Sequence, residues 1–266
     1  FVESKISTGR PVVFPDPAEA AALTQAINEA KTVTLFVGAG VKDAREQVLK
    51  LAEKIKAPIG HALGGKMYIQ YENPFDVGMN GLLGYGAAHE ATHEADLLIL
   101  LGTDFPYNDF LPDANVAQVD INGSHIGRRT KISYPVTGDV AATIENILPH
   151  VDEKKDRSFL DKMLKKHYGK LEHVVEAYTS NVDKHTPIHP EYIADLIDRN
   201  ADEDAIFTVD TGMCNVWGAR YITANGKREQ IGSFRHGTMA NALPQALGAQ
   251  AANPGRQVIT FSGDGG

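Results

Sequence analysis

The chain has 266 residues, which is enough for one large domain or for two smaller ones. With 42% hydrophobic and 23% charged residues it has an ordinary globular composition, and no apolar run is long enough for a membrane-spanning helix. The net charge of −8 argues against a nucleic-acid partner, and the single cysteine, Cys214, excludes a disulfide framework and indicates a reducing compartment.

The first 16 residues predict a linker, because Ser, Thr, Gly and Pro interrupt any regular pattern there. Asp16 can cap a helix that has Pro17 at its first position, and apolar residues at helical spacing extend this helix to Ala30. The chain begins with Phe1 rather than Met and stops inside a glycine-rich loop at Gly266. We therefore expect it to be a fragment of a longer protein.

From residue 33 onward, apolar strands alternate with helices. The expected strands are 33–37, 57–61, 97–101, 116–121 and 134–136, with helices at 43–56, after the glycine-rich stretch 81–86, and up to 148. Residues 64–66 are expected to form a loop. Continuous apolar strands are typical of parallel sheets buried on both faces. The alternation predicts a Rossmann-like, doubly wound parallel α/β domain over residues 17–150.

Gly, Asn or Asp follows each expected strand, at the sheet edge where ligands of such folds lie. Five such loops in series favour an extended ligand across this edge. Gly38 and Gly40 follow the first strand, but the third glycine of the dinucleotide-binding pattern is absent. A nucleotide-binding turn and a compact turn without a ligand are both compatible with these two glycines.

Residues 151–186 are expected to connect two domains. Mixed charges and apolar residues at helical spacing over 151–170 predict a solvated amphipathic helix. The strand–helix pattern then restarts in 187–266, with a helix at 191–199, a strand at 205–209 and a less regular stretch around Trp217. We expect a second parallel α/β domain that is incomplete, because two strands and a helix cannot close a core.

The last segment has a Gly-rich turn at Gly237, a helix of small residues, and a strand at 257–261. Gly263-Asp264-Gly265-Gly266 follows that strand directly. Glycines allow backbone N–H groups to approach phosphate oxygens, and a carboxylate offers a hard oxygen to Mg²⁺. The tripeptide alone is more often a plain turn, but its position after an apolar strand favours a metal–diphosphate site.

Two motifs allow a catalytic interpretation that their context does not favour. His89-Glu90-Ala91-Thr92-His93 matches a zinc-protease pattern, but it lies in a crossover helix without a third ligand, so surface histidines are the better interpretation. Cys214 could be a nucleophile, but no base is identifiable, and a small buried hydrophobic residue is favoured.

Several basic residues also leave two interpretations open. His61 is interpreted as a structural loop residue, whereas His236, next to the Gly237 turn, is expected near the site. Lys66 and Arg128-Arg129 could neutralise a diphosphate, although such residues are usually exposed and solvated.

The series of motifs resembles thiamine-diphosphate-dependent 2-keto acid enzymes, and among them most closely the pyruvate:quinone oxidoreductases (pyruvate oxidases). The resemblance covers essentially the whole chain. It is carried by the motifs Gly81-Leu82-Leu83-Gly84-Tyr85, residues 101–107, residues 120–122, Ile188-His189-Pro190, Trp217-x-Ala219-Arg220-Tyr221, residues 237–250 and Gly263-Asp264-Gly265. Ala240 departs from the glycine of many relatives and leaves the pocket shape open.

The resemblance implies an FAD-binding middle domain over 17–150 and the N-terminal part of a thiamine-diphosphate-binding domain over 187–266. The implied FAD-binding residues are Leu82, Leu83, Gly84, Tyr85, Phe105, Pro106, Tyr107, Asn108, Asp109 and Asn122, with Gly38 and Gly40 as further cofactor-binding candidates.

For thiamine diphosphate, Gly237 and Thr238 would contact the pyrimidine and Met239 would support the bent cofactor. Asp264 would bind Mg²⁺, and Gly265 and Gly266 would donate N–H groups to the diphosphate. The activating glutamate of the family lies outside this chain, so no catalytic residue is assigned. With half of the site absent, we expect this chain alone to be inactive and to hold no metal at Asp264.

The implied activity is oxidative decarboxylation of pyruvate to acetate and CO₂, with electrons passing through FAD to a membrane quinone. The resemblance further implies a homotetramer in the cytoplasm, attached to the lipid surface at the inner face of the cell membrane, with no nucleic-acid partner. Two alternatives stay open. One is an acetolactate-synthase-like carboligase with the same cofactors, and the other is a non-catalytic nucleotide-binding module.

Overall fold

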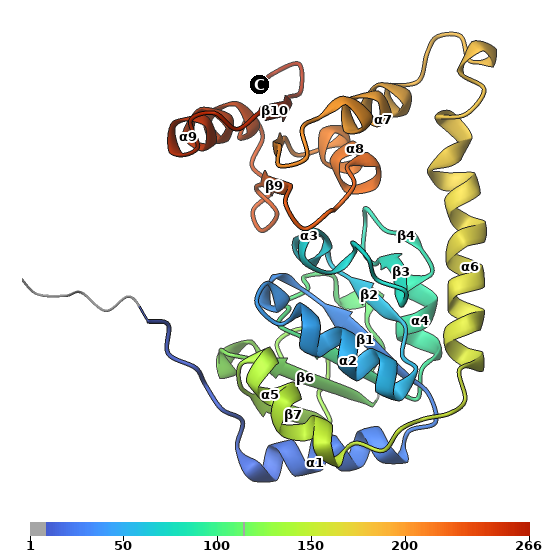
Figure 1. Cartoon of the computed structure of the whole chain (residues 1–266), viewed down its shortest axis with the longest axis vertical. Coiled ribbons are helices and arrows are strands. Elements are labelled where there is room, and N and C mark those ends of the chain that lie inside the picture. Colours follow the sequence, from blue (N-terminus) through green and yellow to red (C-terminus); the bar gives the residue numbers. More distant parts are fainter. Residues whose placement is uncertain (1–8, 114) are drawn as a thin grey trace, which may run out of the picture.

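The computed structural model describes residues 9–113 and 115–266, so the first half of the expected linker lies outside the described residues. Residues 9–16 contain no helix or strand. The rest of the chain forms two parallel sheets with their helices, and one long helix, α6, runs beside both (Figure 1). The functional question is therefore what lies between the two sheets.

The larger sheet has seven strands in the order β4-β3-β2-β1-β5-β6-β7. They are β1 (Val33–Val37), β2 (Ile59–His61), β3 (Asp76–Met79), β4 (Tyr85–Gly86), β5 (Leu97–Leu101), β6 (Val116–Asp120) and β7 (Tyr134–Thr137). All neighbours pair in parallel except β3 and β4. The predicted doubly wound fold is confirmed. The sequence did not predict β3 and β4, which are short and contain glycine.

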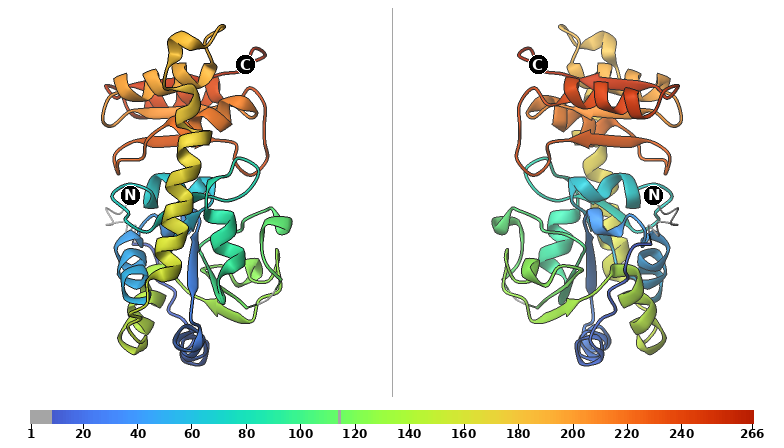
Figure 2. Two further views of the ribbon diagram at one scale, coloured as in Figure 1. Left: turned by 90° about the vertical axis from the view of Figure 1, so that its right-hand side faces the viewer. Right: turned by 90° about the vertical axis from the view of Figure 1, so that its left-hand side faces the viewer.

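Helices α1 (Pro17–Glu29), α2 (Arg45–Ile55) and α5 (Val140–Ile147) share a hydrophobic core with one face of this sheet. Helix α4 (Ala88–Glu94) lies on the opposite face (Figure 2). Strand β5 shows why its sequence is wholly apolar. Leu97, Ile99 and Leu101 pack toward the α1–α2–α5 face, and Leu98 and Leu100 toward the other. Each such buried side chain stabilises the fold by roughly 1.5–3 kcal/mol relative to an exposed one.

Aspartates begin two of these helices, as the sequence predicts for the first. The Asp16 carboxylate accepts from the N–H groups of Ala18 (2.8 Å) and Glu19 (3.3 Å), and Asp139 accepts from Ala141 (3.1 Å). The loop expected at 64–66 is wrong. A 3₁₀ turn at Leu63–Gly65 leads directly into the short helix α3 (Lys66–Ile69), whose first residue is buried.

Helix α6 covers Ser158–Val174, so it begins and ends later than the sequence pattern indicated. It is not simply a solvated helix, because Leu160, Met163 and His167 are buried against the first domain. Lys162 and Lys166 pair with Glu94 of α4 at 2.5 and 2.7 Å. Among the described helices, none is both long and apolar enough to cross a membrane.

The second sheet has three parallel strands in the order β10-β8-β9. They are β8 (Ile206–Val209), β9 (Glu229–Gly232) and β10 (Val258–Phe261), and α7 (Pro190–Asn200), α8 (Met213–Tyr221) and α9 (Ala242–Ala252) accompany them. The prediction of two strands and an irregular stretch around Trp217 is wrong in detail. Strand β9 is half-exposed, and α8 contains a glycine, so neither gives a clear periodic pattern.

Candidate functional site between the two sheets

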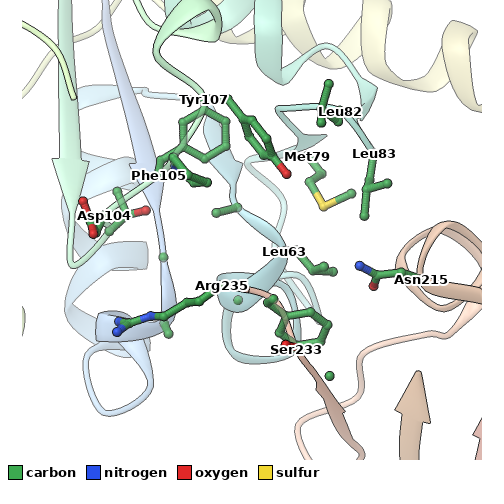
Figure 3. A pocket seen from close by; sticks show the side chains of 18 of the residues that line it. Leu63, Met79, Leu82, Leu83, Asp104, Phe105, Tyr107, Asn215, Ser233 and Arg235 are labelled. Carbon is green, nitrogen blue, oxygen red and sulfur yellow. The ribbon is translucent and has the colours of Figure 1, made fainter. Parts of the chain in front are cut away.

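A cavity of about 540 Å³ lies between the carboxyl ends of the two sheets. One wall comes from the first domain, and Asn215, Gln245 and residues 232–236 of the second domain form the other wall. Figure 3 shows Phe105 and Tyr107 at one end of this interdomain cavity and Ser233 and Arg235 at the other. A volume of this size is typical of small-molecule and cofactor sites.

The cavity includes the point where the order of the first sheet reverses. The chain adds β2, β3 and β4 on one side of β1, and β5, β6 and β7 on the other. The loops after β1 and β5 meet there, and Gly38, Ala39, Gly102 and Thr103 line the cavity. Doubly wound sheets bind ligands at this switch point, so the topology supports the extended ligand expected from the sequence.

Six of the predicted cofactor-binding residues line the cavity: Gly38, Leu82, Leu83, Phe105, Pro106 and Tyr107. Two aromatic side chains among them are held rigidly. Phe105 is 4% exposed and packs edge-to-face on Phe36, with ring centroids 5.0 Å apart. Tyr107 packs on Phe105 in the same way at 5.4 Å. Such pairs fix the ring orientations and form an apolar wall.

The other predicted FAD residues do not line the cavity. Tyr85 is buried, and its hydroxyl accepts a hydrogen bond from Gln70 at 2.7 Å, while the N–H of Gly84 donates to Gly81 at 2.8 Å. Asn122 caps the turn Gly123–His125. Asn108 and Asp109 lie in a separate surface hollow with His93 and Arg129.

Gly40 also lies outside the cavity lining, where its role is packing. A Cβ atom at this position would lie 2.6 Å from the Cα of Gly102, so only glycine allows the loops after β1 and β5 to meet. Gly38 faces the cavity, and Gly40 closes the turn.

Asn80 is a cavity residue that the sequence did not single out. It is 4% exposed, its side-chain oxygen accepts from Gly81 (2.8 Å), and its amide nitrogen donates to the carbonyl of Phe110 (2.9 Å). It thus ties the loop after β3 to the aromatic segment after β5. A polar residue directly after a strand was the available signal.

Asp104 is the charged residue of the first domain's cavity wall. Arg129 binds its carboxylate at 2.9 Å and Arg128 at 3.3 Å. Burial raises the pKa of Asp104, but the hydrogen bond and charge of Arg129 outweigh this and hold the pKa below its ordinary value. The two arginines therefore serve a carboxylate of the chain itself, rather than standing as free cations for a diphosphate.

Asp210 organises the carboxyl edge of the second sheet. It follows β8, is 3% exposed, and accepts from the N–H groups of Ala242 (2.9 Å) and Gly263 (3.1 Å) and from the amide of Asn241 (3.3 Å). Burial raises its pKa, but these backbone donors outweigh burial, and the pKa lies below the ordinary value. One carboxylate thus holds together the segments that begin α9 and follow β10.

The residues predicted to contact the thiamine ring lie on the loop between β9 and α9. Gly237 has the left-handed φ of +62°, and the carbonyl of Thr238 accepts from Thr211 (2.9 Å) and Asn241 (2.6 Å). Met239 is 78% exposed. They do not line the interdomain cavity themselves, but the adjacent residue His236 does.

The loop after β10 has the chemistry to hold a diphosphate and Mg²⁺. Among the described residues, the N–H groups of Asp264 and Gly265 have no hydrogen-bond acceptor, and a Cβ at Gly265 would meet nothing within 4 Å. The N–H of Gly266 is turned inward to the carbonyl of Gly263 at 3.1 Å. Asp264 is exposed and offers one carboxylate, which suits Mg²⁺ because phosphate oxygens and water supply its other ligands.

The alternatives to a cofactor site find no support in the described part of the chain. His89 and His93 lie exposed on α4 with ring centroids 4.3 Å apart, and Glu90 pairs with Lys170. No group of three His, Cys, Asp or Glu residues in 9–113 and 115–266 could hold a metal ion. Cys214 is 7% exposed, and burial raises its pKa, as expected for a structural thiol.

Comparison with known proteins assigns these two domains to one family. A model described as "Thiamine pyrophosphate enzyme, central domain" matches residues 20–147, and one described as "Thiamine pyrophosphate enzyme, C-terminal TPP binding domain" matches residues 210–266. The first match contains all seven strands of the larger sheet, and the second begins directly after β8 and contains β9 and β10.

Three curated relatives illustrate the similarity. The putative thiamine pyrophosphate-containing protein YdaP of Bacillus subtilis is 33% identical over 255 residues, which cover 95% of this chain and 44% of that protein. An acetolactate synthase of Mycobacterium bovis is 30% identical over 277 residues, 96% of this chain and 43% of that protein. An uncharacterized 42.6 kDa protein of Pseudomonas amyloderamosa is 47% identical over 161 residues, 60% of this chain and 40% of that protein.

The chain spans less than half the length of these relatives. The larger sheet lies within the first matched range, and the glycine-rich loop after β10 lies within the second. The chain belongs to the thiamine-pyrophosphate-dependent (thiamine-diphosphate-dependent) enzyme family and carries its central domain and its C-terminal TPP-binding domain.

Proposed function

We propose that the full-length protein is a thiamine-diphosphate-dependent enzyme that joins 2-keto acids such as pyruvate, in the manner of a carboligase. The observation that carries this proposal is the interdomain cavity, which brings the loop that leads into Gly237–Met239 to the ligand edge of a doubly wound sheet. Acetolactate synthases from several organisms align with 90–97% of the chain at 28–30% identity, which favours this product class.

Thiamine diphosphate supplies a nucleophilic carbon and an electron sink for decarboxylation. The chain's own residues would bind and orient it. Asp264 would offer an oxygen to Mg²⁺, and the N–H groups of Asp264 and Gly265, which have no acceptor among the described residues, would donate to the diphosphate. Asp210 keeps this loop in register with the loop before α9 through its bonds to Gly263 and Ala242.

We further propose that the cavity holds the flavin end of FAD. Its switch-point glycines allow a diphosphate to approach the backbone, and the apolar side chains of Leu82, Leu83, Phe105 and Tyr107 provide a surface for a flat ring system. The same apolar wall would exclude water from the region next to His236. In a carboligase this flavin would have a structural rather than a redox role.

A second interpretation is the pyruvate:quinone oxidoreductase implied by the sequence motifs. It rests on the resemblance of the sequence motifs, such as Gly81-Leu82-Leu83-Gly84-Tyr85 and residues 237–250. In this case a flavin bound in the cavity would accept electrons from the thiamine site. The quinone acceptor, the homotetramer and the location at the inner face of the cell membrane belong to this second proposal.

The two proposals differ in their products. Full-length protein with Mg²⁺, thiamine diphosphate, FAD and pyruvate should accumulate acetolactate without an electron acceptor if it is a carboligase. Anaerobic bleaching of the flavin by pyruvate, with acetate formed only when a quinone is supplied, would instead select the oxidoreductase. Neither product, under conditions where both cofactors bind, would contradict both proposals.

The Asp264→Asn variant tests whether the turnover uses the proposed metal site. We expect it to lower activity at least about tenfold at limiting Mg²⁺, because a neutral amide is a poorer ligand for this ion. Asp183→Asn, an exposed change on the connecting segment, is the matched control and should keep the activity. Equal activity of both variants would show that Asp264 does not hold the metal.

A further inference from the structure

Lys66 begins α3 in the first domain, but its side chain reaches the second domain. It is 1% exposed, and its ammonium group donates to the carbonyl oxygens of Gly218 (3.4 Å) and Ile222. These carbonyls lie at the C-terminal end of α8, where helix carbonyls lack intrahelical partners and the helix dipole is negative. A buried ammonium is costly, so a contact of this kind fixes both partners in place.

The charge of Lys66 has limited support from its surroundings. Burial lowers its pKa to about 8, while Asp198 of α7 and Asp76 of β3 favour the charged form. Near neutral pH the side chain of Lys66 is therefore charged, and the hydrogen-bond acceptors of its ammonium group lie on α8. The structure thus buries Lys66, whereas the sequence left open a diphosphate contact or a solvated surface position.

Helix α8 cannot move independently of the second sheet. A Cβ at Gly218 would lie 2.8 Å from a methyl of Val209 and from the amide of Gln230, so α8 packs closely on β8 and β9. On its other side, Ala219 is fully buried against Met79 and Tyr85 of the first domain. By holding α8, Lys66 thus also holds the second sheet, on which α8 packs.

The opposite end of α8 belongs to the site. Asn215, in its first turn, lines the interdomain cavity, and Asp210, which organises the loops of the second sheet, precedes the helix by three residues. A shift of α8 would move Asn215 relative to the wall formed by Phe105 and Tyr107. The separation of the two cavity walls therefore depends on how α8 is held.

We propose that Lys66 is a positioning residue: by capping α8 from the first domain, it sets the separation of the two walls of the interdomain cavity. A second bond supports the same arrangement, since Arg220 of α8 donates to the carbonyl of Gly84 at 3.2 Å. The expected effect on cofactor binding rests on the function proposed above, whereas the effect on α8 does not.

The test uses hydrogen exchange measured by mass spectrometry on the full-length protein. Lys66→Met keeps an unbranched apolar side chain but removes the donors, so amides in α8 should exchange at least about tenfold faster. Amides of β1, β5 and β6 should be unchanged. The Kd of FAD should rise about tenfold because both walls would contact it, while the Kd of thiamine diphosphate should change less than about twofold.

Lys54→Met is the matched control. Lys54 also donates to a carbonyl at a helix end, that of Leu148 at 2.9 Å, but within the first domain. Its loss should speed exchange around residue 148 and leave both α8 and FAD binding unchanged. An unchanged α8 in Lys66→Met, or an equal effect of the two variants on α8, would overturn the proposal.

Lys66→Arg covers the case in which Lys66→Met does not fold. It keeps a cation for the two carbonyls but lengthens the side chain, so α8 should stay protected while the Kd of FAD rises about threefold. An unchanged Kd in a folded Lys66→Arg protein would overturn the proposed role. If wild type binds no flavin but Lys66→Met still exposes α8, the positioning contact stands and the proposed FAD site falls.

Discussion

At the scale of single residues, Asp210 is the acceptor on which the second domain's loops depend. Asp210→Ala removes the partner of the N–H groups of Ala242 and Gly263, and the free energy of unfolding should fall by about 2 kcal/mol. Chemical denaturation measures this loss. Asp210→Asn should also be destabilising, because its NH₂ group would face at least one of the N–H donors that the carboxylate oxygens now accept from.

The pH dependence of this stabilisation has a defined sign. The pKa of Asp210 is lowered in the folded protein, so its contribution is present above the unfolded pKa of about 3.9 and is lost as the pH falls through the folded value. Wild type should therefore lose stability more steeply below about pH 4 than Asp210→Asn. If the free energy of unfolding fell equally with pH in wild type and Asp210→Asn, Asp210 would not be the source of this acid sensitivity.

The raised pKa of Asp76 predicts the opposite effect of pH, a stability that falls as the pH rises. Its side chain is 12% exposed, and burial raises its pKa to about 7, while the neighbouring His61, whose pKa burial lowers to about 3, stays neutral. The folded protein thus holds a proton that the unfolded chain releases near pH 4. The stability that Asp76 contributes is full below about pH 4 and is lost as the pH rises to about 7.

Asp76→Asn should remove this loss. The amide oxygen can still accept from the N–H of Gly78, now bonded at 3.1 Å, and carries no charge to bury. We expect the variant to be more stable than wild type by about 2 kcal/mol at pH 8. Its free energy of unfolding, measured by urea denaturation, should no longer fall between pH 4 and 7. Asp96→Asn, at an exposed position, is the control and should keep the slope.

At the scale of elements, the contact between the loops after β1 and β5 determines the shape of the switch point. In Gly40→Ala the new methyl group would lie 2.6 Å from the Cα of Gly102, and the backbone cannot yield without separating the two strand ends. We expect a loss of about 1–3 kcal/mol in the free energy of unfolding, measured by denaturation without cofactor.

Gly169→Ala on α6 is the control for this prediction. A Cβ there would meet nothing within 4 Å, and alanine has the higher helix propensity, so the protein should gain about 0.5–1 kcal/mol. If Gly40→Ala were equally harmless, the close packing of the two loops would not be required for folding.

The elements of the first sheet were predictable because each strand and helix has its own periodic pattern. Strands β1 and β5 are continuous apolar runs, and Asp16 with Pro17 marks the start of α1. Strand β9 and helix α8 were missed for a physical reason. Their packing depends on other segments of the chain, such as Met79 and Tyr85 against Ala219 of α8 and β8 beside β9, and their own sequences show no clear alternation.

At the scale of the whole molecule, the site belongs to neither domain alone. The ligand edge of the first sheet could be predicted because strand ends of one sheet meet at one edge, and the motif resemblance of residues 101–107 pointed to Phe105 and Tyr107. Asn215, Arg235 and Gln245 could not be placed opposite them, since that depends on how the second sheet sits on the first. Lys66 shows the same limit, because its burial depends on carbonyls more than 150 residues away.

The sequence by itself determined the doubly wound fold and the second parallel domain, because apolar periodicity and glycine loops are local features of the chain. Its motifs resembled the thiamine-diphosphate-dependent family to which the chain belongs. Only the tertiary structure decided which of the predicted residues share a cavity. Gly38 lines the cavity, whereas Gly40 packs against Gly102. Arg128 and Arg129 pair with Asp104, and Lys66 is buried against α8. These outcomes depend on contacts between segments distant in the chain, which local patterns do not encode.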